Sequence, residues 1–471
     1  MNWFPLLQGR FEELILVYFL LLNGIYLALF LVAYFDVRAF YKGSLYADLN
    51  EIFNSPLTPG ISLLVPAFNE EADIVQTVES LLHLEYPRHE VIVINDGSTD
   101  RTMAILRREF DLLPSAGGRA APLPTEAVLG VYRSRVHRHL TVIDKRKGGK
   151  SDALNAGLNA AKHPYFCSID ADDVLESDAL LRIVGHVLES PRRVVAVGGV
   201  VRVLNGCRVE KGRIAKMGLG ARAIEVFQVV EYCRAFLCGR MGFSHLNAVM
   251  ILSGAFAMFE TELVVSIGGY RRGTVGEDME LVTRLHRRMR DEGIRDYCIL
   301  FVPDPVCWTR VPDSLPQLSL QRRRWHRGLL EVLGGSLGML GRARYGAVGL
   351  LAFPFMLVFE GWGVVLECLG YLFFLFALIF GDFDGNFVLA FFAVAVLCGT
   401  ALSMAGILLG EITHRRYPEL RHLLRLFAYC LIENLFYRPL TAGMRLLGVW
   451  DYLVGGGEWG VMRSSAVQAK A

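Results

Sequence analysis

The fold can be predicted from Ile61-Ser62-Leu63-Leu64-Val65 and Pro66-Ala67-Phe68-Asn69-Glu70, consecutive residues of the 471-residue chain. The apolar half suits a buried β-strand, and the proline with the polar residues after it indicates a turn into a helix reaching about residue 83. Residues 91–94 predict a second strand, followed by the turn Asn95-Asp96-Gly97-Ser98-Thr99-Asp100. Strands that alternate with helices are typical of a parallel sheet covered by helices, so we predict an α/β fold.

Two more strands are predicted further along the chain, at residues 140–143 and 165–169. The first leads into the loop Lys145-Arg146-Lys147-Gly148-Gly149-Lys150 and a helix over residues 151–158. Between the second and third strands, residues 111–138 contain prolines and glycines that break any periodicity. We therefore expect an exposed insertion there, and we assign it no function.

Polar residues follow these strands, where ligands bind in open α/β sheets. Asp96 is placed to accept hydrogen bonds from a nucleoside, and glycines with basic residues before a helix make Lys150 a candidate for a diphosphate. Asp170 and Asp172 can converge on Mg²⁺ or Mn²⁺, because alternate residues of an extended segment point the same way. Plainer alternatives stay open: Asp96 as a helix cap, 145–150 as a solvated basic loop, and Asp173 as a cap for the next helix.

Two later motifs add candidate catalytic residues. Gly276-Glu277-Asp278 begins an apparent helix, where Asp278 can accept a proton, although acidic residues also simply favour a helix N-terminus. In Gln321-Arg322-Arg323-Arg324-Trp325, Arg324 offers a fork for phosphate oxygens and Trp325 a face for a ring. The alternative for this motif is an interfacial lipid anchor, and we expect Arg322 and Arg323 to serve lipid contact or packing.

Composition and long apolar runs indicate a membrane protein. Hydrophobic residues make up 53% of the chain, whereas 49 basic and 47 acidic residues leave no basic excess for a nucleic acid partner. Residues 14–35 carry no charge and exceed the roughly 20 residues that cross a bilayer. Further runs cover 350–380 and 387–409. For the weaker run 423–450, spanning, re-entrant and interfacial positions all stay open.

Charges beside these runs predict the orientation. Arg38 and Lys42 follow the first run and His414, Arg415 and Arg416 follow residue 410, so the globular part is expected to face the cytoplasm. We divide the chain into four parts. They are an N-terminal transmembrane helix (1–40), a cytosolic domain (41–347), transmembrane or interfacial helices (348–455) and a short cytosolic tail (456–471).

The motifs in their order resemble those of family 2 glycosyltransferases, and among them the membrane-embedded cellulose, hyaluronan, chitin-oligosaccharide and poly-N-acetylglucosamine synthases. The matching elements are 65–70, 95–98, 148–150 with 153–155, 170–172, 253–255, 276–278 and 321–325. The resemblance implies a GT-A (Rossmann-like) glycosyltransferase domain inserted between N-terminal and C-terminal transmembrane helices. It implies that Asp96 and Asp170 contact the uridine, Asp172 binds the metal and Asp278 is the base. It also implies that Gln321, Arg324 and Trp325 hold the pyrophosphate and acceptor.

We therefore expect an enzyme of the inner membrane that moves a sugar from UDP-GlcNAc or UDP-glucose, with inversion, onto the growing end of a β-linked polysaccharide. Helical spacing over residues 225–240 predicts either an amphipathic helix that lies on the membrane near the acceptor site or a helix packed in the core. Glu360, Glu367 and Glu433 are costly in lipid, so they should face a polar interior or one another and, with Trp362, line a product path.

Three alternatives remain beside this expectation. The first is a single transfer to a lipid or lipid-linked acceptor. The second is a transport protein, which would need more spans. The third is an inactive scaffold, which would lack some of Asp96, Asp172, Asp278 and Trp325.

Overall fold

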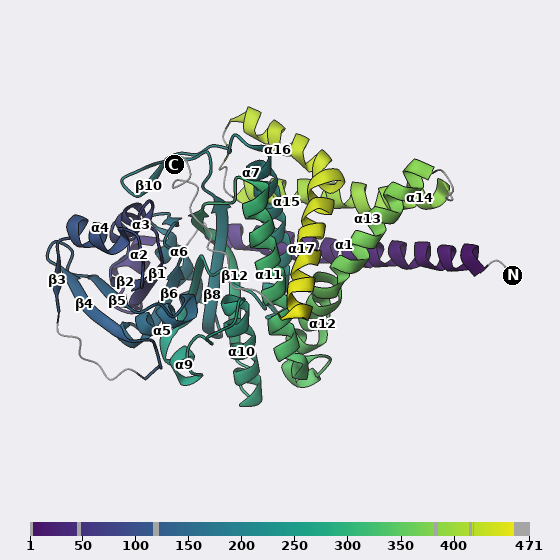
Figure 1. The fold of residues 1–471 in the computed structure, drawn as a ribbon. Coiled ribbons are helices and arrows are strands. Elements are labelled where there is room, and N and C mark those ends of the chain that lie inside the picture. The colour runs from purple at the N-terminus through teal and green to yellow at the C-terminus, as the bar shows by residue number, and fades with distance from the viewer. Residues whose placement is uncertain are drawn as a thin grey trace.

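In the computed structural model, which describes residues 3–44, 49–115, 122–380, 385–413, 417 and 419–455, a mixed sheet is joined to a bundle of long helices (Figure 1). The sheet has ten strands. In spatial order they are β3 (Leu112–Pro114), β4 (Val128–Ser134), β5 (Leu140–Lys145), β2 (His89–Asp96), β1 (Ile61–Ala67), β6 (Tyr165–Ile169), β11 (Phe256–Glu260), β8 (Arg193–Val203), β12 (Tyr297–Thr309) and β7 (Val174–Leu175). The predicted α/β fold is confirmed.

The centre of the sheet is parallel, as the strand and turn patterns predict. Strands β5, β2, β1 and β6 run in one direction, with Val65 opposite Val93 and Leu63 opposite Cys167. Strand β11 is antiparallel to both of its neighbours, β6 and β8. Apolar residues of β1 are fully buried, which is typical of a strand covered on both faces. The carboxyl ends of β1, β2 and β6 therefore meet at one edge.

Helices cover the sheet and carry the later motifs. They are α2 (Leu49–Asn54), α3 (Ile74–Leu82), α4 (Thr102–Glu109), α5 (Lys150–Ala160), α6 (Ala179–Glu189), α7 (Ala223–Arg234), the π-helix η1 (Ala235–Arg240), α8 (Met241–His245), α9 (Thr261–Ser266), α10 (Glu277–Asp291) and α11 (Leu315–Gly335). Helix α5 packs on β1 and β2, and its Gly157 lies against Leu64 and Ile94. A two-stranded hairpin, β9 (Arg208–Glu210) with β10 (Arg213–Lys216), stands apart from the sheet.

The expected exposed insertion at residues 111–138 is mostly exposed in its described part, but it is not separate from the sheet. Strand β4 pairs with both β3 and β5 at the edge of the sheet. Leu123 is buried, and its backbone exchanges two hydrogen bonds with Asn159 of α5. Prolines and glycines interrupted the pattern, but neighbouring strands supply the missing backbone partners. Residues 116–121 lie outside the described part of the chain.

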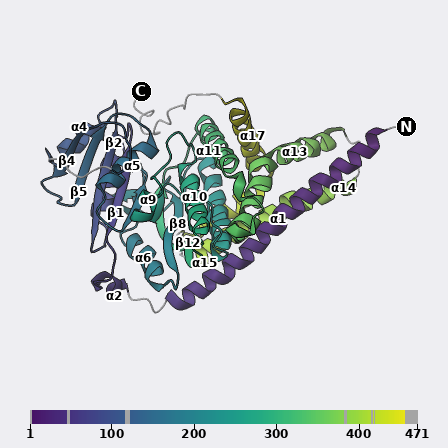
Figure 2. The same cartoon turned by 90° about the horizontal axis from the view of Figure 1, so that it is seen from below.

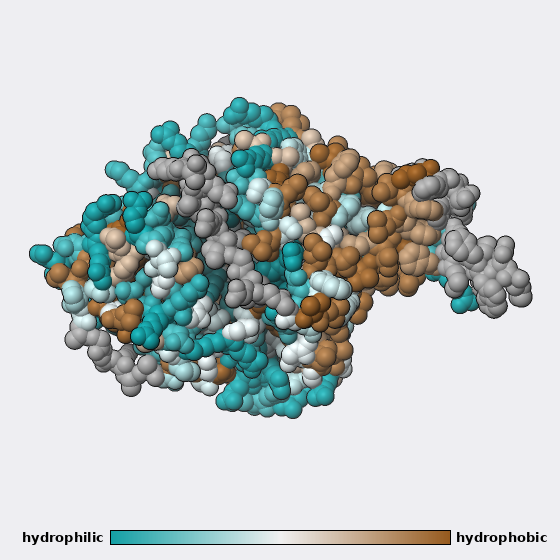
Figure 3. Space-filling view, in the orientation of Figure 1, coloured by the Kyte–Doolittle hydropathy of each residue, from teal (hydrophilic) through white to brown (hydrophobic). Residues whose placement is uncertain are grey.

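Among the residues that the structure describes, three helical segments are long and apolar enough to cross a membrane, namely Gly9–Arg38, Val348–Phe376 and Gly385–Glu411. The first belongs to α1 (Trp3–Ser44), which runs along one side of the molecule (Figure 2). The elements of the other two are η4 (Val348–Ala352), α12 (Phe353–Phe355), η5 (Met356–Trp362), α13 (Gly363–Phe380), α14 (Gly385–Phe391), η6 (Phe392–Cys398) and α15 (Gly399–Thr413). Apolar side chains gather on the surface over α1, α13 and α14 (Figure 3).

The weaker apolar run near the C-terminus is not among these candidate spans of the described residues. It forms α16 (Leu420–Ile432), η7 (Glu433–Tyr437) and α17 (Arg438–Val454). Helix α17 packs along α11 and α13, so it joins the sheet domain to the apolar helices (Figure 1). The predicted tail 456–471 and the basic residues 414–416 lie outside the described residues.

Candidate active site

The turns that follow β1 and β2 are tied to each other by side-chain hydrogen bonds. Asn69 adopts a left-handed φ of 59°, a conformation that asparagine tolerates better than most residues. Its Oδ1 accepts a hydrogen bond from the Thr99 backbone at 2.8 Å, and its own N–H donates to Ser98 Oγ at 3.0 Å. The Glu70 N–H donates to Thr102 Oγ1 at 2.9 Å. These contacts hold the two turns side by side at the sheet edge.

Asp96 organises the basic loop after β5. Its carboxylate accepts hydrogen bonds from the N–H groups of Gly148 and Gly149, at 2.9 and 2.7 Å, and from Lys145 Nζ at 2.5 Å. Gly149 has φ 91°, which favours glycine. The alternative of a helix cap does not hold for Asp96, because Asp100 accepts the Thr102 N–H at the start of α4. The carboxylate of Asp96 also holds the loop 145–150 in place, through Lys145, Gly148 and Gly149.

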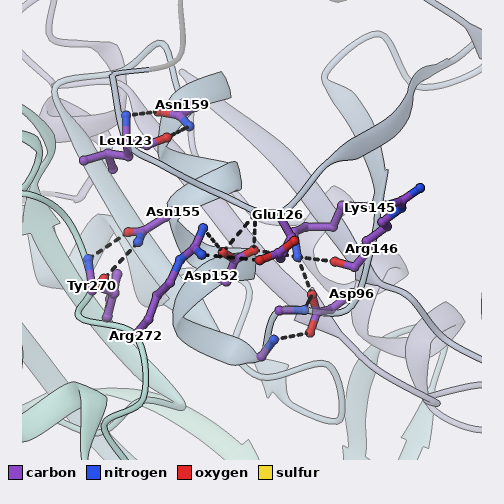
Figure 4. Close-up of polar contacts among 12 residues, drawn as sticks. Asp96, Leu123, Glu126, Lys145, Arg146, Asp152, Asn155, Asn159, Tyr270 and Arg272 are labelled. Carbon is purple, nitrogen blue, oxygen red and sulfur yellow. Dashed lines mark hydrogen bonds and ion pairs between the residues drawn. The ribbon is translucent and has the colours of Figure 1, made fainter.

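A buried network extends from Asp96 to helix α5 (Figure 4). Lys145 is fully buried and pairs with Asp96 and with Asp152, whose oxygen lies 2.6 Å from Nζ. Asp152 also pairs with Arg272, and its carboxylate accepts the Glu126 N–H. The buried cation of Lys145 would be costly without Asp96 and Asp152. The exposed Arg272 adds an ion pair to Asp152, so the pairing links the loop, α5 and the segment before α10.

Asn155 makes a second connection in the same region. Its side chain donates to the Tyr270 carbonyl at 2.8 Å and accepts the Tyr270 N–H at 2.7 Å (Figure 4). The backbone on the approach to Gly276-Glu277-Asp278 is thereby attached to α5.

Lys150 connects the motif after β6 to the motif that begins α10. Its Nζ lies 2.5 Å from Asp170 Oδ1 and 3.3 Å from Glu277 Oε1. Burial opposes the charge on Lys150, but Asp170 and Glu277 outweigh it and raise the pKa of the amine. Lys150 therefore stays cationic at neutral pH, as a group that meets a diphosphate should.

Asp172 lies in an excess of negative charge. Burial and Asp170 raise the pKa of Asp172 to about 7, and burial and Asp172 raise the pKa of Glu70 to about 8. Crowded carboxylates of this kind favour a bound cation. Asp173 is fully buried beside them and is not the N-cap of α6, which begins after Asp178.

These residues fit a divalent metal that is shared with a phosphorylated ligand. In the described part of the chain, no group of three or more His, Cys, Asp or Glu side chains is arranged to hold a metal by itself. Mg²⁺ usually takes only one or two protein carboxylates and obtains its other ligands from phosphate and water. Of the two predicted ligands, Asp170 already pairs with Lys150, which leaves Asp172 as the more available one.

Asp278 lies at the first turn of α10, where two backbone donors orient it. Its Oδ1 accepts the Met279 N–H at 2.7 Å, and its Oδ2 accepts the Gly254 N–H at 3.3 Å. Burial and Glu277 raise the pKa of Asp278 to about 6. A carboxylate with this pKa is ionised at pH 7 and is more basic than an ordinary aspartate, which suits proton abstraction.

The helix N-terminus itself is held in place by a close crossing of α10 and α11. A Cβ on Gly328 would lie 2.8 Å from the Gly276 nitrogen. Only glycine permits this approach, and it brings the start of α10 next to the helix that carries residues 321–325.

Side chains of α11 separate into buried and cavity-facing groups. Arg322 is buried, pairs with Glu231 at 2.7 Å, and stacks on the Trp325 ring at 4.5 Å. Arg323 pairs with Asp451 of α17. Arg324 is exposed, and no ion pair joins it to another described residue. Arg322 therefore has the packing role that was one of the two expected for it, whereas the side chain of Arg323 is 40% exposed and is held by its ion pair with α17.

All eight predicted site residues line one cavity of about 1250 Å³. They are Asp96, Lys150, Asp170, Asp172, Asp278, Gln321, Arg324 and Trp325. The cavity continues to residues of the apolar helices, including Tyr26, Glu360, Glu367 and Arg445. Trp362 is 41% exposed and is not among the lining residues, so the expectation that it lines a path is wrong.

Several supporting residues escaped the sequence interpretation. Lys145 and Asp152 were within the quoted motifs, but nothing in their spacing shows that they pair. Arg272 and Glu231 carry no motif at all. Only the folded chain brings these charges together, because their partners are distant in sequence.

Comparison with known proteins identifies the family. The model described as "Glycosyl transferase family 2" matches residues 62–223, and "Glycosyl transferase family group 2" matches residues 165–405, just over half of the chain. A poly-beta-1,6-N-acetyl-D-glucosamine synthase of Staphylococcus epidermidis is 29% identical over 275 residues, which are 58% of this chain and 55% of that protein. The synthase of Staphylococcus aureus strain COL is 28% identical over the same length. The chain spans about half the length of the curated relatives it matches.

Solved structures with a similar chain trace are more distant in sequence. The mannosyltransferase PcManGT from Pyrobaculum calidifontis, in complex with GDP-Man and Mn2+, is 19% identical with a TM-score of 0.48. That comparison covers 88% of this chain and 99% of the other. S. aureus TarS 1-349 in complex with UDP-GlcNAc is 14% identical with a TM-score of 0.41, over 80% and 91% of the two chains. The family models, whose matches span the sheet, the cavity motifs and part of the apolar helices, show that this chain belongs to the family 2 glycosyltransferases.

Proposed function

We propose that the chain is a membrane-embedded glycosyltransferase that moves N-acetylglucosamine from UDP-GlcNAc, with inversion, onto the growing end of a β-linked polysaccharide. The observation that carries this proposal is that one cavity is lined both by the polar residues at the edge of the sheet, such as Asp96 and Asp172, and by residues of the apolar helices, such as Glu360. The names of the staphylococcal relatives support N-acetylglucosamine over glucose as the sugar.

Donor binding is assigned to the edge of the sheet. Asp96 and Asp170 contact the uridine, and Lys150 and Arg324 offset the charge of the diphosphate. A Mg²⁺ or Mn²⁺ ion held by Asp172, with Asp170 as the second candidate ligand, would neutralise the leaving diphosphate when bound. Lys150 exchanges part of its contact with Asp170 for phosphate oxygens as the donor enters.

Transfer itself is assigned to Asp278. Its carboxylate takes the proton of an acceptor hydroxyl while that oxygen attacks the anomeric carbon from the face opposite the diphosphate. The bond from the acceptor oxygen to the anomeric carbon forms as the bond from that carbon to the phosphate oxygen breaks. The configuration at the anomeric carbon is therefore inverted, and UDP leaves with the electron pair. Trp325 supports the acceptor ring, and Gln321 lies beside it in the cavity wall.

The membrane assignment completes the proposal. The three candidate membrane helices support a multi-pass protein, with residues 1–40 and 348–455 in or at the bilayer. Arg38, beside the first of these helices, supports a cytoplasmic position for residues 41–347. The growing polymer leaves along the part of the cavity that Glu360 and Glu367 line.

The test uses purified full-length protein in lipid vesicles with Mn²⁺ or Mg²⁺. Labelled UDP-GlcNAc and UDP-glucose are supplied separately, and the labelled product is sized, with Asp278→Asn as the matched control. A long product from UDP-GlcNAc alone, absent in the variant, is the expected result. A product with one added sugar would favour transfer to a lipid-linked acceptor, and turnover with neither donor would overturn the proposal.

A further inference from the structure

Arg240, at the end of the π-helix η1, lines the cavity without a partner for its charge. The structure gives its guanidinium no hydrogen bond and no ion pair among the described residues, and its Nη1 atom is fully buried. A buried donor that stays unpaired is costly, so such a group usually has an acceptor in the working protein. Arg234, on the preceding turn of the helix, differs because it pairs with Glu433 at 3.1 Å.

Aromatic rings hold the guanidinium in a fixed position. The Arg240 Cζ atom lies 4.1 Å from the centroid of Phe236, which in turn stacks on Phe301 at 5.9 Å with an angle of 15°. Phe236 and Arg240 are both in η1, and π-helical turns occur often at functional sites. The stack orients the fork of Arg240 while leaving its nitrogens available, which is a poor arrangement for a residue that only packs.

Asp278 lines the same cavity, and its charge attracts the Arg240 guanidinium. Its two oxygens accept backbone N–H groups of Met279 and Gly254, and no ion pair joins it to Arg240. The attraction of Arg240 nevertheless lowers the pKa of Asp278 against the opposite effect of burial. The two side chains thus line the same cavity without forming an ion pair with each other.

We propose that Arg240 binds the acceptor sugar, by donating hydrogen bonds to a hydroxyl or carbonyl oxygen next to the hydroxyl that Asp278 deprotonates. This inference rests on the proposed function and adds an acceptor-binding residue to it. A sugar oxygen beside the nucleophile can accept from the guanidinium, while the nucleophile itself keeps its lone pair for the attack. The proposed nucleotide contacts are made by Asp96, Asp170, Lys150 and Arg324, and none of them involves Arg240.

Binding of acceptor and of nucleotide can be measured separately and without turnover. Calorimetry on the solubilised full-length protein would use a short oligosaccharide of β-linked N-acetylglucosamine as one probe and UDP with Mn²⁺ as the other. Arg240→Gln should weaken oligosaccharide binding about tenfold or more, the loss expected for hydrogen bonds to a charged group, with UDP affinity unchanged. Arg240→Lys, which keeps the charge but not the fork, should bind with intermediate affinity.

The matched control is Arg107→Gln, which removes another arginine stacked on a ring, Tyr132, at the far edge of the sheet. It should change neither affinity. Equal oligosaccharide affinity in the wild type and Arg240→Gln would overturn the inference, as would an equal loss of UDP binding or a wild type that binds no oligosaccharide. A wild type that binds the oligosaccharide through Arg240 but makes no polymer would overturn the proposed function alone.

Discussion

Asp278 is buried beside Glu277, and this environment gives the proposed reaction a specific pH dependence. Burial and Glu277 raise its pKa to about 6, and a base works only when it is deprotonated. We expect kcat/KM to fall about tenfold per pH unit as pH drops below 6, and to level off above it. UDP release at saturating Mn²⁺, which keeps Asp172 ionised, measures this. A rate that stays constant down to about pH 5, close to the ordinary range of a carboxyl group, would contradict the role of Asp278.

Asp172 should link metal binding to stability. Its pKa in the folded protein, about 7, lies above that of an unfolded chain, so its contribution to stability is lost as pH rises from about 4 to 7. Asp172→Asn should therefore unfold at a higher temperature than the wild type at pH 7 without metal. Mn²⁺ should raise the wild-type Tm by about 1 °C for each 1 kcal/mol of binding free energy, the shift expected for a chain of this length, and leave the variant unchanged.

Thermal unfolding of the solubilised protein checks this prediction. Asp296→Asn, which removes an exposed carboxylate outside the cavity, is the control and should respond to Mn²⁺ as the wild type does. A metal-induced shift of equal size in Asp172→Asn would exclude Asp172 as a ligand.

Sequence reasoning found the cavity residues at the sheet edge because chain order and strand direction suffice to collect them, whereas Asp278 and Gln321 lie on helices and were found from motifs and the family resemblance. Asp96, Asp170 and Asp172 follow parallel strands, whose carboxyl ends share one edge. The supporting charges could not be found in this way. Lys145 pairs with Asp152, and Asp152 pairs with Arg272, which is 120 positions further along the chain. No local sequence pattern therefore predicts the network.

The sequence predicted the elements that have a strong periodic pattern. It did not predict the strands that depend on hydrogen bonds to neighbouring strands of the sheet. Strands β1, β2, β5 and β6 and helix α5 were predicted close to their observed bounds, and the start of α10 was predicted at the correct place. Strand β4 is half-exposed and has Gly130 within it, and it is stable because β5 provides hydrogen-bond partners. The helix over 225–240 was predicted with its environment left open. Spacing alone does not show that it packs between the apolar helices and the cavity.

The crossing of α10 and α11 should be sensitive to one methyl group. Gly328→Ala places a Cβ 2.8 Å from the Gly276 nitrogen, so the start of α10 must move away and take Asp278 with it. We expect kcat to fall by about tenfold to a hundredfold, since misplacing a reacting group by 1 Å has that effect, with UDP affinity retained. Gly335→Ala, on the same helix with open space at its Cβ, is the control and should keep full activity.

For the whole molecule, charges within the apolar helices join the catalytic domain to the proposed membrane segments. Arg445 of α17 lies 3.3 Å from Glu360 and 3.6 Å from Glu367, and Tyr18 of α1 donates to Glu367. Glu433 pairs with Arg234 and accepts a hydrogen bond from Ser403. These carboxylates face arginines and the cavity, which agrees with the expected polar interior, but the sequence did not reveal the arginine partners.

Glu360→Leu tests whether this cluster serves the export of a product. The change leaves Arg445 only partly neutralised in a low-dielectric setting, where a cation that has lost a partner is strongly destabilising. Arg445 should then turn towards the remaining polar surface, which is the cavity that Glu360 and Glu367 line, and obstruct it. We expect vesicles with this variant to make shorter polymer while binding UDP normally, as seen by sizing the labelled product. Glu13→Leu, an exposed carboxylate near the start of α1, should yield wild-type lengths. Polymer of normal length and yield from Glu360→Leu would mean that the product does not pass this cluster.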